Sequence, residues 1–483
     1  MRLVARVEGV ELMAGKRLTN PAGSSNDLRG DVLRVLGVLK VATADQIQRI
    51  ASPHLTYRHT TKSSASKQKT ARTASHAGAL SDLRKHGLAE NGGTSRAGES
   101  LRNLTVKGLE AASYELGRPL TEMGATARGA GSSGATHPMA VNETVIALLR
   151  PKPDLKLLTA EPAEAKAAAQ AAVDASPGVG TIASYTTEVP LPATGMWSAP
   201  GKGGAQADIV LTAPQAGIPL LFIEVDNCHE TAEEIAAKLA KYHRFFKRTI
   251  KDTDGKDKPM WRTRWLAHTT DPAEVPHPPV LIVFNHIGAR DPNRTLPRLQ
   301  ELTRPLWAGE RASSGYSSYD RKIPIIATGL RNLRAHGPAG PVFLRFGRTE
   351  MQTLRDAVGN PRRDAVLVRE RERMKVQQEE YREQLRRVAE ENKAKQEARR
   401  PLCAECGAKF PDDRWKTAEA YPEPALRWLP TLCKPCQDKA IEAADQAERD
   451  RLAAEAAATA EKARGWRSRF RPGQAQGDPG QAP

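Results

Sequence analysis

Residues 220–246, with the sequence LLFIEVDNCHETAEEIAAKLAKYHRFF, constrain the fold of this chain more than any other segment. The segment begins with an apolar run typical of a buried β-strand and continues with apolar residues at helical spacing. Thr231 and Glu234 have the spacing of a capping box, which marks the start of the helix. A strand that leads into an amphipathic helix predicts a mixed α/β domain with a central sheet.

Two carboxylates lie within this apolar strand. Because side chains alternate along a strand, Glu224 and Asp226 lie on one face together with Leu220 and Phe222. Carboxylates on a buried strand are costly unless a metal ion or a lysine neutralises them. Asp208, in the strand segment QADIVL, is a third acid of this kind. Acids from two neighbouring strands can bind Mg²⁺, which activates a water molecule to attack a phosphodiester.

A nuclease site of this kind also needs a cation beside the attacking water. Ile235, Leu239 and Tyr242 define the buried stripe of the helix, and Lys238 projects roughly 70° from its centre. Lys238 is therefore the cation of this helix that can lean toward the acids. We expect Asp208, Glu224, Asp226 and Lys238 to be the catalytic residues if the site is active. The alternative is an ion cluster that shapes the cleft without chemistry.

The surrounding sequence extends this pattern into a domain of residues 137–348. Apolar runs and helical periodicity alternate in the order helix, three strands, helix, strand. The expected helices cover 137–150, 161–174 and 231–248, and the expected strands cover 181–191, 205–213, 218–226, 279–287, 323–330 and 341–347.

Residues 27–116 contain three helix patterns, then two short strands around a Gly-rich turn and a further helix. Thr43 and Gln46 form a capping box at the second helix, and Gly87 ends the third. This order predicts a winged helix-turn-helix, whose third helix enters the major groove of DNA. The candidate DNA contacts are Arg72, Ser75, His76, Arg84 and Lys85. The alternative is a fold that mediates only protein contacts.

Lys and Arg residues exceed Asp and Glu residues by 73 to 56, which gives a net charge of +17. This excess favours a polyanionic partner such as nucleic acid, and an anionic membrane surface less; the alternative is a basic protein without such a partner. The N-terminal segment has no apolar signal-peptide core, and no stretch approaches the ~20 apolar residues of a membrane span. We therefore expect a cytoplasmic protein that is not inserted in a membrane.

Four of the five cysteines form two CxxC pairs, Cys403 with Cys406 and Cys433 with Cys436. Four thiolates in this pattern are typical of a tetrahedral structural Zn²⁺ site. The alternative, a redox dithiol, is expected beside a βαβ pattern, which this region lacks. The cysteines therefore predict a zinc ribbon over residues 401–440.

The remaining segments are expected to connect these domains. Residues 364–400 are highly charged, and the apolar positions at Leu367, Met374, Tyr381 and Val388 make too thin a seam for a coiled coil, so a solvated spacer helix is expected. The other expected segments are a flexible N-terminus over 1–26, a linker over 117–136, and a helix followed by a disordered basic tail over 441–483.

Over about residues 27–250 the chain resembles the replication-relaxation proteins of bacterial plasmids and other mobile elements. The resemblance rests on LGVLKVATADQIQRI, ALSDLRKHGLAE and NLTVKGLEAA, then on HPMAVNE, ADIVL and FIEVDNCHETAEEIAAKLAKYHRFF. It implies that the second domain has a PD-(D/E)xK fold, similar to restriction endonucleases.

The resemblance also implies roles for individual residues. Asp208, Glu224 and Asp226 correspond to the metal-site acids and Lys238 to a relocated lysine, with Tyr242 four residues further on the same helix. Glu143 corresponds to an accessory acid. The chain departs from the family pattern at Ala207, where a proline is expected, and at Asp226, where Glu-x-Lys would place a lysine.

These observations predict a DNA-binding protein that acts in plasmid or mobile-element replication, relaxation or transfer, with metal-dependent DNA cleavage as a candidate activity. The expected partners are DNA and proteins of replication or conjugation, and the expected metal ions are structural Zn²⁺ and, if the site is active, Mg²⁺. One alternative is a catalytically inactive, nuclease-like regulator, and another is an adaptor that binds only proteins.

Overall fold

The computed structural model describes residues 24–127, 135–265, 275–313 and 315–468. Most of the expected flexible N-terminus, part of the expected linker and the end of the expected tail lie outside these ranges. The chain divides into two compact units, Met1–Val368 and Arg369–Pro483, and each is described by itself.

The first unit begins with a small helical module that carries a three-stranded sheet. Its strands pair antiparallel in the order β1-β3-β2. The module consists of α1 (Asn26–Leu39), β1 (Val41–Thr43), α2 (Ala44–Ala51), α3 (Ala65–Lys85), β2 (Ala89–Thr94), β3 (Ser100–Leu104) and α4 (Val106–Leu116).

Local capping explains where these helices begin and end. Thr43 and Gln46 form the expected capping box at the start of α2. Gly87 has a φ of 69°, and this left-handed conformation lets the chain turn away after α3. The third helix was expected only from His76 onward, after the polar segment 61–75, but α3 begins within that segment at Ala65, after the N-cap Ser64. The first half of α3 is mostly exposed and lacks the apolar periodicity that would have revealed it.

A seven-stranded mixed sheet forms the centre of the first unit, with the order β14-β13-β12-β9-β6-β5-β4. β4, β5 and β6 are antiparallel neighbours, whereas β6, β9 and β12 run parallel. Its strands are β4 (Tyr185–Leu191), β5 (Ala205–Ala213), β6 (Ile218–Asp226), β9 (Val280–Phe284), β12 (Ile325–Gly329), β13 (Phe343–Arg345) and β14 (Met351–Gln352). The expected mixed α/β fold is confirmed.

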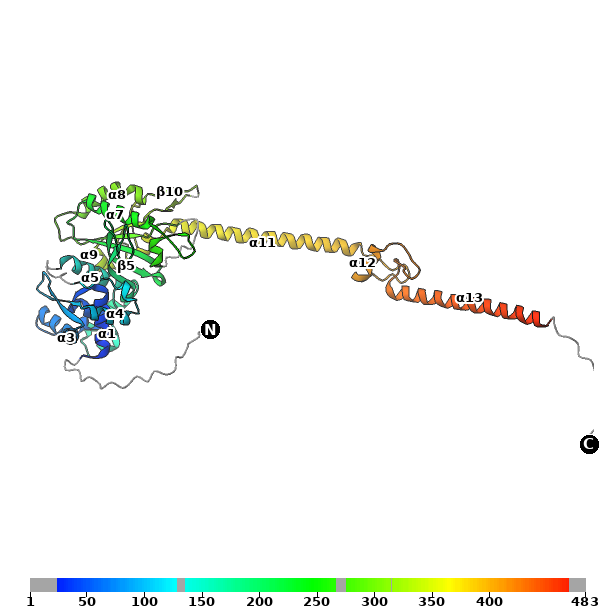
Figure 1. Cartoon of the computed structure of the whole chain (residues 1–483), viewed down its shortest axis with the longest axis horizontal. Coiled ribbons are helices and arrows are strands. Elements are labelled where there is room, and N and C mark those ends of the chain that lie inside the picture. Colours follow the sequence, from blue (N-terminus) through cyan, green and yellow to red (C-terminus); the bar gives the residue numbers. More distant parts are fainter. Residues whose placement is uncertain (1–23, 128–134, 266–274, 314, 469–483) are drawn as a thin grey trace, which may run out of the picture. The chain divides into compact units, whose positions relative to one another are not determined.

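Helices cover both faces of this sheet (Figure 1). Alternate residues of β6 divide between two cores: Ile223 and Val225 pack with α1, α5 and α9, whereas Leu220 and Phe222 pack with α7 and α8. The covering helices are α5 (Thr136–Leu149), α7 (Ala232–Lys247), α8 (Pro292–Trp307) and α9 (Leu330–His336). The other α-helices and strands of this unit are α6 (Ala163–Asp174), α10 (Leu354–Val358), β7 (Thr249–Lys251), β8 (Asp257–Pro259), β10 (Glu310–Arg311) and β11 (Ser317–Ser318).

The helical module and the large sheet share one hydrophobic core. Val38 of α1 and Leu211 of β5 belong to the same cluster of buried residues. The hydroxyl of Thr187 on β4 donates a hydrogen bond of 2.6 Å to the carbonyl of Val38. This continuous core holds the module and the sheet in a single arrangement, so that a groove between them has defined walls.

Residues beyond Val368 form the second unit. The helix α11 (Pro361–Ala398) begins before this boundary and covers most of the charged segment 364–400. Its apolar positions Met374, Tyr381 and Val388 are 61%, 60% and 52% exposed, as expected for a solvated helix. Two further helices, α12 (Asp412–Ala420) and α13 (Lys434–Ser468), flank the cysteine pairs.

Candidate functional site

The three predicted acids lie at neighbouring positions on the α7 face of the sheet. Ile209 pairs with Ile223 in the antiparallel β5–β6 ladder, so Asp208 lies opposite Glu224. Asp208, Glu224 and Asp226 are only 8%, 6% and 7% exposed. Burial of this extent means that each carboxylate needs hydrogen-bond donors or a cation within the protein.

Helix α7 supplies two donors to Glu224. The hydroxyl of Tyr242 donates to Oε1 of Glu224, and Nζ of Lys238 lies 3.6 Å from Oε2. Lys238 also donates a hydrogen bond of 2.6 Å to Glu230, in the loop before α7. The structure thus places Lys238 and Tyr242 beside Glu224.

Asp208 and Asp226 have donors of their own. Nε2 of His137, on α5, lies 3.0 Å from Oδ1 of Asp208, and the main-chain N–H of Val225 donates to its Oδ2 at 2.7 Å. Oδ1 of Asp226 accepts a hydrogen bond of 2.9 Å from the N–H of Cys228. The cavity bordered by Glu224, Asp226 and Lys238 measures only about 10 Å³, which is roughly the space for one water molecule.

Burial, and then neighbouring charges, shift the pKa values of several carboxyl groups upward. Burial, and then the charge of Asp208, raise the pKa of Glu224 to about 8, although Lys238 and the Tyr242 hydroxyl act in the opposite direction. Burial and the neighbouring Glu230 raise the pKa of Asp226. Burial and Asp208 likewise raise the pKa of Glu188 on β4. The cluster therefore has more carboxylates than nearby cations can neutralise.

Sequence reasoning missed three members of this cluster: His137, Glu188 and Glu230. His137 lies in the first turn of α5, and its hydrogen bond to Asp208 raises the pKa of the imidazole. His137 and Glu230 lie within the quoted motifs HPMAVNE and FIEVDNCHETAEEIAAKLAKYHRFF, but no periodicity places any of the three beside Asp208 or Lys238, because this proximity depends on how the segments pack.

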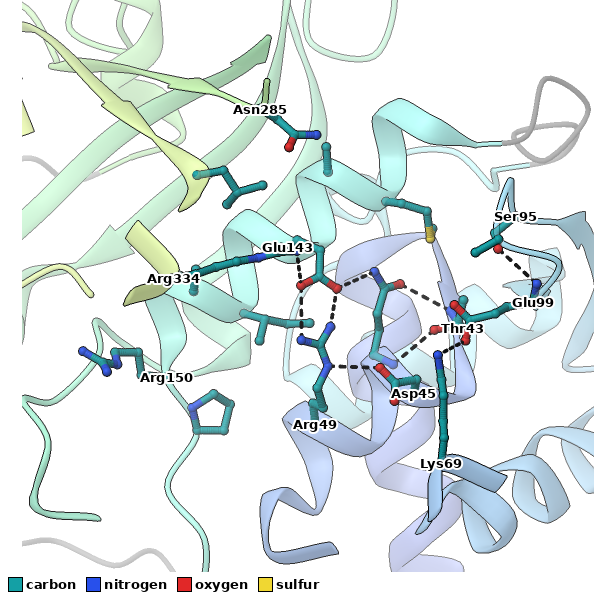
Figure 2. Close-up of a pocket in the computed structure, with 18 of the residues that line it drawn as sticks. Thr43, Asp45, Arg49, Lys69, Ser95, Glu99, Glu143, Arg150, Asn285 and Arg334 are labelled. Atoms are coloured by element: carbon teal, nitrogen blue, oxygen red, sulfur yellow. Dashed lines mark hydrogen bonds and ion pairs between the residues drawn. The ribbon is translucent and has the colours of Figure 1, made fainter. Parts of the chain in front are cut away.

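The structure does not place Glu143 in the acid cluster, so the expected role of an accessory acid is not supported. Glu143 instead accepts hydrogen bonds from Arg49 of α2 and Arg334 of α9, and from Gln46 (Figure 2). Burial raises the pKa of Glu143, but Arg49, Gln46 and Arg334 together outweigh this effect and hold the pKa below its usual range. Glu143 therefore connects the helical module to the sheet domain.

The predicted DNA contacts on α3 lie in different environments. Ser75, Arg84 and Lys85 are exposed, whereas Arg72 donates to Gln48 at 2.7 Å and to Asp45 at 2.5 Å. The prediction for His76 is revised: its side chain is fully buried, and burial lowers the pKa of the imidazole to about 4. His76 is a neutral core residue of the module and cannot reach a ligand from this position.

The four predicted zinc ligands come together in the second unit. The Sγ atoms of Cys403, Cys406, Cys433 and Cys436 all lie within 4.8 Å of one another. Cys406 and Cys433 are 3.7 Å apart, and the N–H of Cys433 donates to Sγ of Cys403 at 3.2 Å. Among the residues that the structure describes, these cysteines are the one group of three or more Cys, His, Asp or Glu side chains that converges this closely. The predicted four-cysteine metal site is confirmed as an arrangement of ligands.

Within the described ranges, no helix is long and apolar enough to cross a membrane.

The fold and these sites define a mixed α/β protein with a helical module, a carboxylate cluster on the central sheet and a separate four-cysteine module. Residues 33–257 match the family model described as replication-relaxation, so this part of the chain is similar to that family. The matched segment contains Asp208, Glu224 and Lys238 and ends before the four cysteines of the second unit. Searches of curated proteins and of solved structures gave no significant match.

Proposed function

We propose that the chain is a DNA-binding protein that acts in the replication, relaxation or transfer of a plasmid or other mobile element. The observation that carries this proposal is the helical module, whose α3 ends in the exposed cations Arg84 and Lys85. The replication-relaxation match and the net charge of +17 support the same conclusion.

The helical module has the element order and strand pairing of a winged helix-turn-helix. In such a fold α3 is the helix that enters the major groove, and the β2–β3 turn is the wing that follows the DNA backbone. Ser75, Arg84 and Lys85 are the proposed contacts from α3. Arg72 is held by Asp45, and Arg96 in the β2–β3 turn is exposed, so both are placed to contact phosphates.

Binding to a fluorescently labelled duplex, followed by anisotropy, tests this proposal. The variant Arg84→Gln/Lys85→Gln is expected to bind about tenfold more weakly and to reduce the slope of log affinity against log salt by about 2. The matched control Lys251→Gln/Lys256→Gln removes the same charge from the exposed β7–β8 hairpin and is expected to have little effect. Equal duplex affinity for the α3 variant and the wild type would rule out α3 as the contact surface.

The domain after the helical module resembles the restriction-endonuclease-like fold in its order of elements, α5, β4, β5, β6, α7 and β9. Metal-dependent DNA nicking is therefore the second candidate function, and Lys238 at 3.6 Å from Glu224 favours it. Mg²⁺ prefers carboxylate oxygens such as those of Asp208, Glu224 and Asp226, but here each carboxylate already has its own donor. Each of these donors occupies one carboxylate oxygen and leaves lone pairs of the carboxylate able to bind a metal ion, so a nuclease-like platform that binds DNA without cutting it is the alternative to this function.

Incubation of supercoiled plasmid with Mg²⁺ or Mn²⁺ separates these two functions. For a binding platform, the wild type nicks no more plasmid than the variant Glu224→Ala/Lys238→Ala. Nicking that depends on the metal ion and is abolished in this variant would instead establish the enzyme.

We also propose that the four cysteines bind one Zn²⁺ ion. Thiolates at about 2.3 Å from a tetrahedral ion lie about 3.8 Å from one another, which agrees with the 3.7 Å between Cys406 and Cys433. The ion would hold together a module whose buried apolar core is small, with Phe410 as its one fully buried aromatic ring. This module and α11 are the proposed contact surfaces for replication or conjugation proteins, and the proposed location of the protein is the cytoplasm.

A further inference from the structure

A groove with a volume of about 1110 Å³ opens between the helical module and the sheet domain. One wall consists of residues from α2, α3 and the β2–β3 turn, and the other consists of residues from α5, α9 and the segment after β9 (Figure 2). Because the two parts share a continuous core, the groove is a fixed feature of the first unit.

The lining of the groove is strongly basic. Seven Lys and Arg residues and three Asp and Glu residues line it, which gives these residues a net charge of +4. Arg49 and Arg334 face each other across Glu143, and Lys69 pairs with Glu99. A concave surface with this excess of positive charge attracts an anionic ligand.

Two of the cations in the lining are held by hydrogen bonds to uncharged carbonyl groups, which do not neutralise their charge. Arg150 donates to the carbonyl of His336 at 2.9 Å, and Lys152 donates to the carbonyl of Ala172 at 2.6 Å. Hydrogen bonds to main-chain carbonyls fix the direction of these side chains but leave their full charge available to a ligand. Arg150 and Lys152 therefore have the properties of phosphate contacts.

The groove reaches the main chain at the end of β6 from the α5 and α9 side of the sheet, whereas the acid side chains lie on the α7 face. Asn285, in its lining, donates from its N–H to the carbonyl of Asp226 at 2.7 Å. Thr136, also in the lining, is adjacent in α5 to His137, which contacts Asp208. A chain that occupied the groove would thus pass beside the end of β6 that carries the acids.

The size and composition of the groove indicate what kind of polyanion it accepts. The groove has a volume of about 1110 Å³ and is lined on two sides, so a thin polyanionic chain fits it better than a wide duplex does. A single strand is thinner and exposes its bases, which stack on aromatic rings in basic grooves of this type. Tyr57, at the end of the 3₁₀ helix Pro53–Tyr57, contributes such a ring to the lining.

We propose that this groove binds single-stranded DNA, with Arg150, Lys152 and Arg334 contacting phosphates and Tyr57 stacking against a base. The proposal rests on the DNA-binding function proposed above and adds a second contact surface, which shares Arg72 and Arg96 with the duplex-binding surface but does not include the exposed end of α3. A protein with both surfaces would bind a site where duplex and unpaired DNA meet.

Anisotropy of a labelled oligothymidylate of about 12 nucleotides, titrated with the full chain, tests the groove. The variant Arg150→Gln/Lys152→Gln removes two charges but keeps side chains that can donate to the same carbonyls. We expect it to bind the oligonucleotide about tenfold more weakly, with a salt slope reduced by about 1.4. Tyr57→Ala is expected to weaken binding about fivefold without changing the salt slope.

Two controls make the outcomes separable. Lys251→Gln/Lys256→Gln loses the same charge outside the groove and should bind the oligonucleotide within about twofold of the wild type. The groove variant should bind duplex DNA as the wild type does, and its thermal unfolding should be unchanged. If the folded groove variant and Tyr57→Ala bind the oligonucleotide as the wild type does, the groove proposal is wrong while duplex binding through α3 stands. If the wild type binds neither the oligonucleotide nor duplex DNA, the proposed function itself is wrong.

Discussion

The hydroxyl of Tyr242 donates a hydrogen bond to the carboxylate of Glu224, so one turn of α7 presents both Tyr242 and Lys238 to the same buried acid. Tyr242 is completely buried, and its ring packs edge-on against Phe222 of β6 at 5.9 Å between centroids. The tyrosine is thus fixed by the aromatic core, and it holds Glu224 in one orientation. This contact and Lys238 together provide donors to a carboxyl group that is buried inside the sheet domain.

The raised pKa of Glu224 predicts a pH-dependent stability. The folded-state pKa of Glu224, about 8, lies above the ordinary value of 4.5. The folded protein therefore favours the protonated carboxyl group, and the stability that this contributes is present at low pH and is lost as the pH rises toward 8. In metal-free buffer, Glu224→Gln should remove this loss, and its free energy of unfolding should exceed that of the wild type at pH 8 by on the order of 2 kcal/mol. Urea denaturation between pH 5 and pH 8 measures the difference. A wild type and variant with parallel pH profiles would show that Glu224 is already ionised in the folded protein.

Glu143 should contribute to stability because it joins α2 to α9. Glu143→Gln leaves Arg49 and Arg334 without their shared carboxylate, and we expect a loss of about 1–3 kcal/mol in the free energy of unfolding. Glu99→Gln is a matched control, because the Lys69–Glu99 pair is half-exposed and should contribute less than about 1 kcal/mol. Equal losses for both variants would mean that Glu143 acts only as a surface charge.

The contribution of Glu143 to the free energy of unfolding depends on pH with the opposite sign to that of Glu224. Because the pKa of Glu143 is held below 4.5, its contribution is present above this value and is lost as the pH falls through the folded-state pKa. The stability difference between the wild type and Glu143→Gln should therefore shrink in acid. A difference that stayed constant down to pH 3 would contradict this assignment.

The four-cysteine module should contain one zinc ion per chain, measured by mass spectrometry of the purified protein. Cys403→Ser is expected to reduce the zinc content to a small fraction and to unfold the module, which would be seen as rapid proteolysis after Val368. Cys228→Ser is the matched control, because Cys228 is buried in the other unit and should leave the zinc content unchanged. Stoichiometric zinc in Cys403→Ser would contradict the proposed ligand set.

The strand β6, the helix α7 and the position of Lys238 could be predicted because they depend on local periodicity. Alternation along 218–226 placed Glu224 and Asp226 on one face, and the helical period placed Lys238 on the flank nearest that face. The capping boxes at Thr43 and Thr231 fixed two helix starts to within one residue. The four-cysteine site could also be predicted from the sequence, because cysteines in two CxxC pairs are typical of one metal site.

Long-range packing could not be predicted in this way. Glu143 meets Arg334 across 191 positions of sequence, and no pattern near Glu143 distinguishes this ion pair from a place in the acid cluster. α8 was not predicted, because Pro297 and Pro305 interrupt its sequence as helix breakers, although both lie within the folded helix. His76 looked like a contact on α3 until its burial showed that it faces the core.

The measurement that tests the central claim most directly is the affinity of the full wild-type chain for duplex DNA as a function of salt concentration. If the helical module binds DNA through Arg72, Arg84, Lys85 and Arg96, log affinity should fall linearly with log salt, with a slope of about −3 or steeper. Absence of duplex binding at low salt, or an affinity that does not change with salt, would contradict the account.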